Sequence, residues 1–164
     1  FHLKLMASSG LKPKVKESPA ERLVLEHFLP YRLSILANRV SRAIAARYAK
    51  AFDLTIPEWR VIAVLGRRPG LTAKEIAEAT EMDKVAVSRA VARLTAKRRV
   101  MATSDPDDAR RQMLALSTLG ANLHAKIAPV ALECETRLLD ALEPRERALL
   151  DALINRLLLA AKSI

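Results

Sequence analysis

Residues 71–117 carry two short helical patterns separated by a polar turn, followed by two strand patterns around a charged tip. In the first helical pattern, Thr72 is a suitable N-cap and Glu75 follows three residues later, which is the spacing of a capping box. Asp83 is placed to cap the second helix, because its carboxylate favours the positive helix end. This order of elements predicts a winged helix-turn-helix, which places one helix in the major groove of DNA and a hairpin beside it.

The second helical pattern has an apolar face and a basic face. Val87, Val91 and Leu94 recur at i, i+4 and i+7 and are expected to be buried. Lysine and arginine side chains on this helix suit phosphates and guanine, and its alanine and serine side chains allow a close approach to base edges. On an isolated helix the same cations would more simply form a solvated face, but the hairpin that follows favours DNA. The expected DNA contacts of this helix are Lys84, Ala86, Ser88, Arg89 and Arg93, with Lys97 just beyond it as a phosphate contact.

The hairpin pattern consists of Met101–Ser104 and Gln112–Ser117, with a strong turn signal in residues 105–108 between them. Arg110 and Arg111 come directly after this turn. An arginine at the tip of a hairpin can enter the narrow, negative minor groove, and an acidic neighbour can hold its guanidinium in place. The predicted wing contacts are Asp108, Arg110 and Arg111, and Thr72 completes the predicted DNA-binding set.

These residues resemble the MarR family of bacterial transcriptional regulators over roughly residues 28–163. The resemblance rests on Leu71-Thr72 with Glu75-Ile76-Ala77, on Val87-Ser88-Arg89 with Val91 and Arg93-Leu94, and on Asp108-x-Arg110 with Leu116-Ser117. It implies a winged helix-turn-helix regulator that binds duplex DNA.

Two positions depart from the family pattern. The family usually has two basic residues after the wing aspartate, whereas this chain has Asp108-Ala109-Arg110, with Arg111 as the next cation. The family usually has glycine in the turn after the recognition helix, whereas this chain has Arg98. A non-glycine residue is strained where a turn needs a positive φ, so we expect the turn geometry to be affected, but not the family assignment.

Two long helical segments flank the predicted DNA-binding module at residues 54–117. They cover residues 28–52 and 118–163, and the second contains Pro129 and restarts at Pro144. The helix that starts at Pro144 is leucine-rich on more than one face, so it needs a second apolar partner. We expect the flanking helices to form a homodimer, which would space two recognition helices about one DNA turn apart on a pseudo-palindromic operator.

The expected fold is therefore mainly α with a small β-hairpin, in a single domain over residues 20–164. We expect residues 1–19 to be a mobile basic leader, in which residues 1–5, before Met6, are additional to the native chain. The sequence shows no apolar run long enough for a bilayer and no secretory segment, so no membrane association is expected.

The charge balance favours a polyanionic partner. The formal net charge is +10, which suits DNA, RNA or an anionic membrane surface. Aromatic residues make up 4% of the chain, which argues against a protein that stacks single-stranded bases. The sequence shows no Gly-rich phosphate loop, nucleophile motif or HExxH motif, so we expect no enzyme activity and no cofactor.

Cys134 is the one cysteine of the sequence, so no disulfide can form within the chain and a reducing cytoplasm is expected. We favour a buried, inert position for it over a thiol sensor. The three histidines, His2, His27 and His124, lack the spacing of metal ligands, so no metal site is expected.

The leading functional prediction is a sequence-specific double-stranded DNA-binding regulator, a repressor released by a small ligand. The resemblance implies a ligand crevice between the dimer helices and the DNA-binding module, with Arg39 as the cation for an aromatic carboxylate. Arg32, Asn38 and Trp59 are candidates for the same crevice. The competing interpretations are that Trp59 packs in the core and that Arg32 and Arg39 are solvated or lie at the dimer interface. The alternative function is a ligand-independent architectural or chromatin-type DNA-binding protein.

Overall fold

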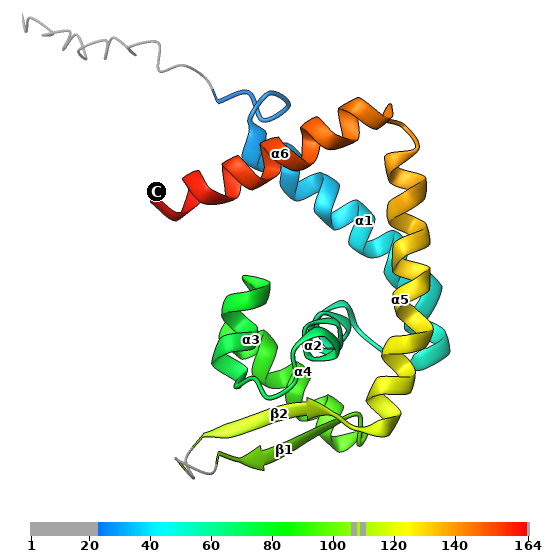
Figure 1. Ribbon diagram of the computed structural model, residues 1–164, viewed down its shortest axis with the longest axis vertical. Helices are drawn as coiled ribbons and strands as arrows, with labels where there is room; N and C mark the ends of the chain where they lie inside the picture. Colours follow the sequence, from blue (N-terminus) through cyan, green and yellow to red (C-terminus); the bar gives the residue numbers. More distant parts are fainter. Residues whose placement is uncertain (1–22, 106–107, 109–110, 164) are drawn as a thin grey trace, which may run out of the picture. The chain divides into compact units, whose positions relative to one another are not determined.

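The computed structural model describes residues 23–105, 108 and 111–163, and the chain divides into two units, residues 1–35 and 36–164 (Figure 1). The described part of the first unit is a hydrogen-bonded turn followed by the start of α1 (Leu29–Phe52). The helix then continues into the second unit. The predicted leader at residues 1–19, and Arg110 of the predicted wing, lie outside the described residues.

Within its described residues, the second unit holds the rest of α1, five further α-helices, a short 3-10 helix and a two-stranded antiparallel hairpin. This mainly helical fold with one small hairpin is the fold class predicted from the sequence. None of the described helices is both long and apolar enough to cross a membrane. The elements after α1 are α2 (Ile56–Arg67), α3 (Ala73–Thr80), α4 (Lys84–Ala96), β1 (Val100–Ser104), β2 (Gln112–Leu116), α5 (Thr118–Leu139), α6 (Pro144–Ala160) and η1 (Ala161–Ser163).

Side-chain caps fix the starts of α3 and α4. The Thr72 hydroxyl accepts a hydrogen bond from the Glu75 amide, and the Glu75 carboxylate accepts one from the Thr72 amide at 2.8 Å. The predicted capping box of α3 is therefore confirmed. Asp83 Oδ1 accepts hydrogen bonds from the amides of Val85 at 2.8 Å and Ala86 at 3.0 Å, which confirms the predicted cap of α4. These caps satisfy amide donors that have no partner within the helix.

Three helices end on a non-glycine residue with positive φ. These residues are Asp53 at 46°, Glu81 at 50° and Arg98 at 54°. The turn at Arg98 is closed by the two backbone hydrogen bonds of a Schellman motif. The left-handed conformation is disfavoured for residues with a Cβ, so Arg98 holds strain where the family usually has glycine. The turn therefore has a positive φ at Arg98 and still closes normally, so the geometry that we expected to be affected is kept.

The hairpin is tied to the segment that leads into α3. β1 and β2 pair over their whole length, and the predicted strands agree with them to within one residue. The Gly70 amide donates to the Leu114 carbonyl oxygen, and the Leu114 amide donates to the Leu71 carbonyl oxygen, both at 2.8 Å. The base of the wing is therefore held against the helix-turn-helix by backbone hydrogen bonds.

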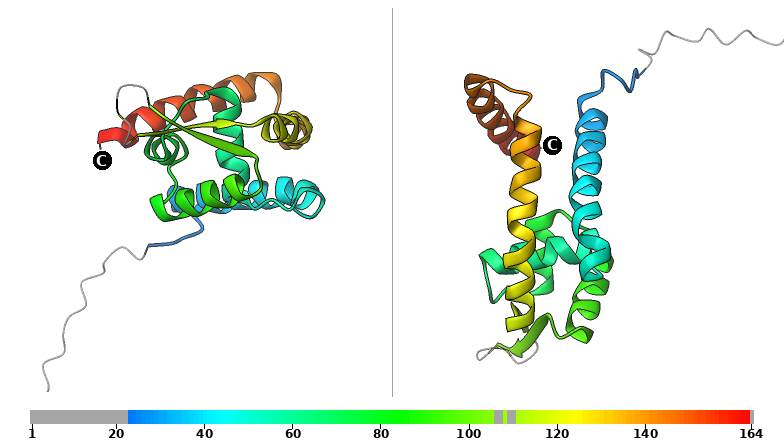
Figure 2. Two further views of the ribbon diagram at one scale, coloured as in Figure 1. Left: turned by 90° about the horizontal axis from the view of Figure 1, so that it is seen from below. Right: turned by 90° about the vertical axis from the view of Figure 1, so that its right-hand side faces the viewer.

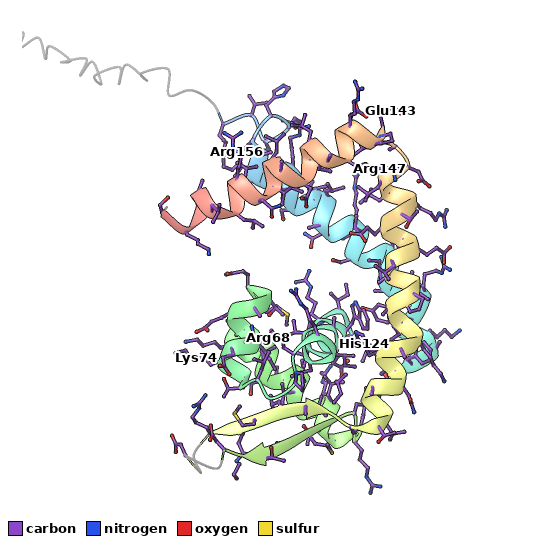
Figure 3. All side chains as sticks on the ribbon, viewed as in Figure 1. Arg68, Lys74, His124, Glu143, Arg147 and Arg156 are labelled. Atoms are coloured by element: carbon purple, nitrogen blue, oxygen red, sulfur yellow. The ribbon has the colours of Figure 1, made fainter. Side chains whose placement is uncertain are left out.

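The core forms where α2, α3 and α4 pack together and meet the hairpin, the end of α1 and the start of α5 (Figure 1). Trp59 of α2 is half-buried and packs between two rings: Tyr48 of α1, with ring centroids 5.8 Å apart, and His124 of α5, at 6.0 Å. His124 is labelled in Figure 3. The stripe predicted on α4 faces this core. The buried apolar residues are Tyr48, Leu54, Val61, Ile62, Leu65, Leu71, Ile76, Ala77, Val87, Ala90, Leu94, Val100, Leu114, Leu123 and Ile127.

The start of α5 is fixed to the turn that follows α4. The Ser117 hydroxyl donates to the Arg98 carbonyl oxygen at 2.6 Å, and the Ser117 amide donates to the Arg99 carbonyl oxygen at 3.0 Å. A Cβ on Gly120 would overlap the same Arg99 carbonyl oxygen, so this position requires glycine. α5 then continues through Pro129 to Leu139.

α6 has no buried residue in the described structure. Near its start, Arg147 donates to the Leu142 carbonyl oxygen at 3.0 Å and to Asp140 Oδ1 at 3.2 Å, across the bend from α5 (Figure 3). The rest of the helix exposes large apolar side chains, which we call the α6 leucine face. It consists of Leu149, Leu150, Leu153, Ile154, Leu157, Leu158 and Leu159.

Candidate nucleic-acid interface

The exposed side of α4 is basic and has no acidic residue. Four of the predicted contacts on this helix, Lys84, Ser88, Arg89 and Arg93, are exposed, and Ala86 is half-buried. Among the described residues, no ion pair engages any of the three cations. Their charges are therefore available to a polyanion such as DNA.

A hollow of about 320 Å³ lies between the start of α2 and the basic side of α4, and we call it the α2–α4 hollow. It brings Arg89 and Arg93 next to Thr55 and Pro57 at the N-terminal end of α2. The N-terminal end of a helix carries a partial positive charge, which favours an anion. The hollow therefore combines two guanidinium groups with a helix end in a way that suits a phosphate group.

The wing contains an ion pair that the sequence did not predict. Arg111 Nη1 lies 3.3 Å from Asp105 Oδ2, and backbone hydrogen bonds at 2.9 Å and 2.8 Å join Arg111 to Asp105 and to Asp108. The predicted partner of Asp108 was Arg110, which lies outside the described residues. Of the predicted wing contacts, the structure therefore describes Arg111 and Asp108, and it places Arg111 at the base of the loop.

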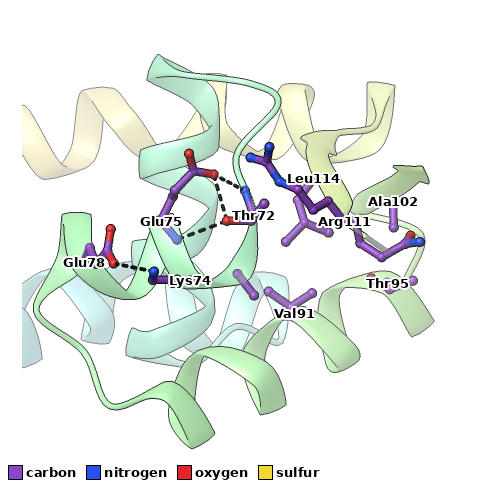
Figure 4. A pocket seen from close by; sticks show the side chains of 11 residues that line it. Thr72, Lys74, Glu75, Glu78, Val91, Thr95, Ala102, Arg111 and Leu114 are labelled. Carbon is purple, nitrogen blue, oxygen red and sulfur yellow. Dashed lines mark hydrogen bonds and ion pairs between the residues drawn. The ribbon is translucent and has the colours of Figure 1, made fainter. Parts of the chain in front are cut away.

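Thr72 lies beside the wing, in a hollow of about 820 Å³ between α3, α4 and β2 (Figure 4). Its hydroxyl donates to Glu75 Oε2 at 2.7 Å and accepts from the Glu75 amide at 3.2 Å (Figure 4). Arg111 and Leu114 line the same hollow (Figure 4). The structure thus gives Thr72 a capping role, and its predicted contact with DNA stays a prediction.

Two cations just after α4 bind the end of α1, in an arrangement that we call the α1–α4 clamp. Lys97 Nζ donates to the Asp53 carbonyl oxygen at 2.8 Å and lies 2.9 Å from Asp53 Oδ2. Arg99 donates to the carbonyl oxygens of Asp53 at 3.1 Å and Phe52 at 2.6 Å. The Lys97 ammonium is therefore engaged within the protein, so its geometry does not support the predicted phosphate contact.

The clamp also reaches a buried carboxylate at the start of α2. Glu58 is 1% exposed, and its Oε1 lies 3.6 Å from Lys97 Nζ. Its Oε2 accepts hydrogen bonds from the amide and the hydroxyl of Thr55, both at 2.7 Å. Burial raises the pKa of Glu58, but the two hydrogen bonds from Thr55 and the charge of Lys97 outweigh it, so the pKa lies below its ordinary value. The carboxylate is therefore held in its charged form.

A groove of about 520 Å³ lies between α1 and α5, which run alongside each other after residue 36 (Figure 2). We call it the α1–α5 groove. Arg47 is paired across it with Glu133 at 3.1 Å, whereas no ion pair within the described residues engages Arg39 or Arg137. Apolar walls with two such cations suit an organic anion. The lining residues are Leu36, Arg39, Val40, Ala43, Arg47, Cys134, Arg137 and Leu138.

Of the four residues predicted to bind a ligand, Arg39 is the one that lines this groove. Trp59 packs in the core between two rings, as described above. Asn38 is exposed on α1 but does not line the groove, and Arg32 belongs to the first unit. Sequence reasoning missed Arg137, because its distance from Arg39 along the chain gives no sign that the two share a groove.

Cys134 is half-buried and lines the groove, whereas the sequence placed it in the core. The residues that α5 buries are others, Leu123 and Ile127 among them. The Cys134 thiol therefore lies outside the buried stripe of this helix. Within the described part of the chain, no group of three or more His, Cys, Asp or Glu side chains is arranged to hold a metal ion.

A model of the MarR family matches residues 52–111, from the end of α1 to the wing. The match covers the helix-turn-helix, both halves of the α1–α4 clamp and the basic side of α4. This match, together with the likeness to known regulators given next, supports a winged-helix regulator of the MarR family.

Similarity to other known proteins extends beyond residues 52–111. The transcriptional regulator HosA of Escherichia coli O111:H- is 26% identical over 106 residues, which are 65% of this chain and 78% of HosA. A MarR/EmrR family transcriptional regulator from Acinetobacter sp. ADP1 has a TM-score of 0.76 at 27% identity, over 82% of this chain and 95% of that one. MepR of S. aureus, solved in complex with DNA, shares the fold with a TM-score of 0.72 at 23% identity, over 81% of this chain and 98% of MepR.

Proposed function

We propose that this MarR-family protein is a homodimeric, sequence-specific double-stranded DNA-binding repressor that works in the cytoplasm. The observation that carries the proposal is the basic side of α4. Lys84, Arg89 and Arg93 are exposed there without ion-pair partners in the described structure, on a helix with both ends fixed. A single α-helix fits the major groove of DNA. MepR, which has the same fold, has been solved with DNA bound.

The geometry supports different roles for the basic residues. Arg93 lines the α2–α4 hollow, where the start of α2 would help it hold a phosphate. Arg89 also lines this hollow, and from the exposed side of α4 it would read a guanine, with Ser88 and Ala86 allowing the helix to come close to the base edges. In the wing, Arg110 would reach the minor groove with Asp108 holding its guanidinium in place, and Arg111 would add a positive charge at the base of the loop.

The α6 leucine face supports the dimer. Seven large apolar side chains of one helix are exposed in the described structure, and a large exposed apolar surface is typical of an interface. We propose that a second copy of this chain covers the α6 leucine face. Symmetric dimers are the most common assembly of soluble proteins, and a dimer matches the two half-sites of a palindromic DNA site. The dimer would place two α4 helices about one DNA turn apart.

The α1–α5 groove supports a ligand response. Arg39 and Arg137 would hold the carboxylate of a small aromatic acid, with its ring against Leu36, Val40 and Leu138. α1 runs from this groove to Phe52 and Asp53, which Lys97 and Arg99 tie to the end of α4. A ligand that prefers one position of α1 would therefore shift the position of α4 and release DNA.

Selection of duplexes from a random pool tests the proposal, followed by competition between selected and random DNA at about 150 mM salt. We expect selected sites to be pseudo-palindromic and to bind at least about a thousandfold tighter than random duplex. Equal affinity for both would instead support the architectural alternative, which the net charge of +10 also accommodates.

A further inference from the structure

Val85, the second residue of α4, is 54% exposed. The structure describes every residue of α4, and Val85 is the one large apolar side chain exposed on it. The sequence predicted contacts from the cations and small residues around Val85 but assigned nothing to Val85 itself. An exposed valine at the start of a helix with a basic side needs its own explanation.

Val85 lies on the outward side of the helix. An α-helix has about 3.6 residues per turn, so Val85 is rotated about 160° from the buried Val87. Arg89 follows one turn later and Ala92 about two turns later on the same side, and both are exposed. Val85 therefore stands in line with the arginine that we propose to read a base.

Folding gives no reason for valine at this position. Valine has a lower helix propensity than the alanine or lysine that suit exposed helix positions, and the described structure leaves more than half of Val85 open to solvent. The surrounding charges indicate what covers this side chain. Lys84 is its neighbour, Arg89 is one turn away, and α4 has no carboxylate, so a polyanion is the partner that this surface accepts.

We propose that Val85 is a specificity-determining residue that packs against the C5 methyl group of a thymine in the major groove. This inference rests on the proposed function. The thymine methyl is the apolar group that bases present in that groove, and small apolar side chains recognise it by contact. Residues in the first turn of a recognition helix lie closest to the base edges.

The backbone and side chain of Val85 suit this task. Its amide donates to Asp83 Oδ1 at 2.8 Å, so the N-terminal cap holds the residue in place. Its β-branch leaves one strongly preferred χ1 rotamer in a helix, so the methyl groups are presented without a further loss of side-chain entropy. A lysine or glutamine side chain at this position would lose more rotamer freedom on binding DNA.

The test replaces thymine by uracil, which removes the methyl group and keeps every hydrogen-bonding group of the base. Starting from a duplex selected by the wild-type protein, each dT of one half-site is changed to dU in turn, and the dissociation constant is measured. We expect one position at which dU raises the dissociation constant of the wild-type protein about fourfold, which corresponds to the free energy of burying one methyl group. Changing that position in both half-sites should weaken binding by about the square of this factor.

Val85→Ala should bind the dT and dU duplexes equally well at that position. Leu119→Ala removes a similarly exposed apolar side chain from α5, and this control should keep the full preference for dT. If every dU duplex binds the wild-type protein like its dT parent, or if Val85→Ala keeps the preference, the inference is wrong. If no duplex can be selected at all, the proposed function fails instead, so the two failures are distinguishable.

Discussion

The ammonium nitrogen of Lys97 lies 3.6 Å from Oε1 of Glu58, a carboxylate that is almost completely buried at the start of α2. The same ammonium group binds Asp53 at the end of α1. One side chain just beyond the recognition helix therefore contacts both the end of α1 and the start of α2. Because a buried charge without a partner is costly, Glu58 and Lys97 fix the end of α4 relative to α2.

Glu58→Gln should destabilise the protein by about 1–3 kcal/mol, because it weakens two charge-assisted hydrogen bonds from Thr55 and removes the partner of Lys97. This loss of folding stability should depend on pH. The folded-state pKa of Glu58 is lowered, so its stabilisation is fully present above the unfolded value of about 4.3 and is lost as the pH falls through the folded value.

Urea unfolding between about pH 6 and pH 3 measures this effect. The wild-type free energy of unfolding should fall with acidification, and that of Glu58→Gln should fall less steeply. Glu75→Gln is the matched control, because Glu75 makes the same capping box on α3 without a lysine partner. A Glu58→Gln variant with the wild-type slope would show that Glu58 titrates normally in the folded protein.

Arg98→Gly should raise the free energy of unfolding by about 0.5–1 kcal/mol. Glycine removes the strain of a side chain at a φ of 54°, and the greater freedom of glycine in the unfolded chain offsets part of that gain. Arg98→Ala keeps a Cβ but loses the charge, so it should give no such gain. Equal stabilisation by both variants would point to the charge of Arg98 rather than to its backbone conformation.

Leu153→Glu should convert a dimer into a monomer, because it places a charge in the middle of the α6 leucine face. Sedimentation equilibrium over a range of protein concentrations measures the change. Asn155→Glu is the control, because it adds the same charge to α6 at a residue that is already polar. If Leu153→Glu keeps the wild-type dimer dissociation constant, the leucine face is not the dimer interface.

Arg39→Ala and Arg137→Ala should leave DNA affinity unchanged but weaken release by aromatic carboxylates about ten- to a hundredfold, the effect of losing a charge-assisted hydrogen bond. DNA-binding titrations with a panel of phenolic and cinnamic-type acids measure this. Arg42→Ala, an exposed α1 residue that does not line the groove, should respond like the wild type. If no acid in the panel releases the wild-type protein from DNA, the carboxylate response is wrong.

Local sequence patterns predicted the features that depend on residues within one or two helical turns. The caps at Thr72 and Asp83 and the stripe containing Val87 are of this kind. The bonds from Lys97 and Arg99 to the end of α1 were not predictable, because the partners stand 44 and 47 residues away and lysine and arginine have no pattern that marks a clamp. The core position of Trp59 likewise depends on Tyr48 and His124, which other helices supply.

The central claim is that the basic side of α4 reads the sequence of duplex DNA, and base-by-base affinities of wild type and Arg89→Ala test it most directly. On a duplex selected by the wild-type protein, Arg89→Ala should cost about 1–3 kcal/mol and lose the preference at one base pair of each half-site, while preferences elsewhere are kept. The claim is contradicted if Arg89→Ala weakens binding to selected and random duplexes by the same factor and leaves every base preference unchanged.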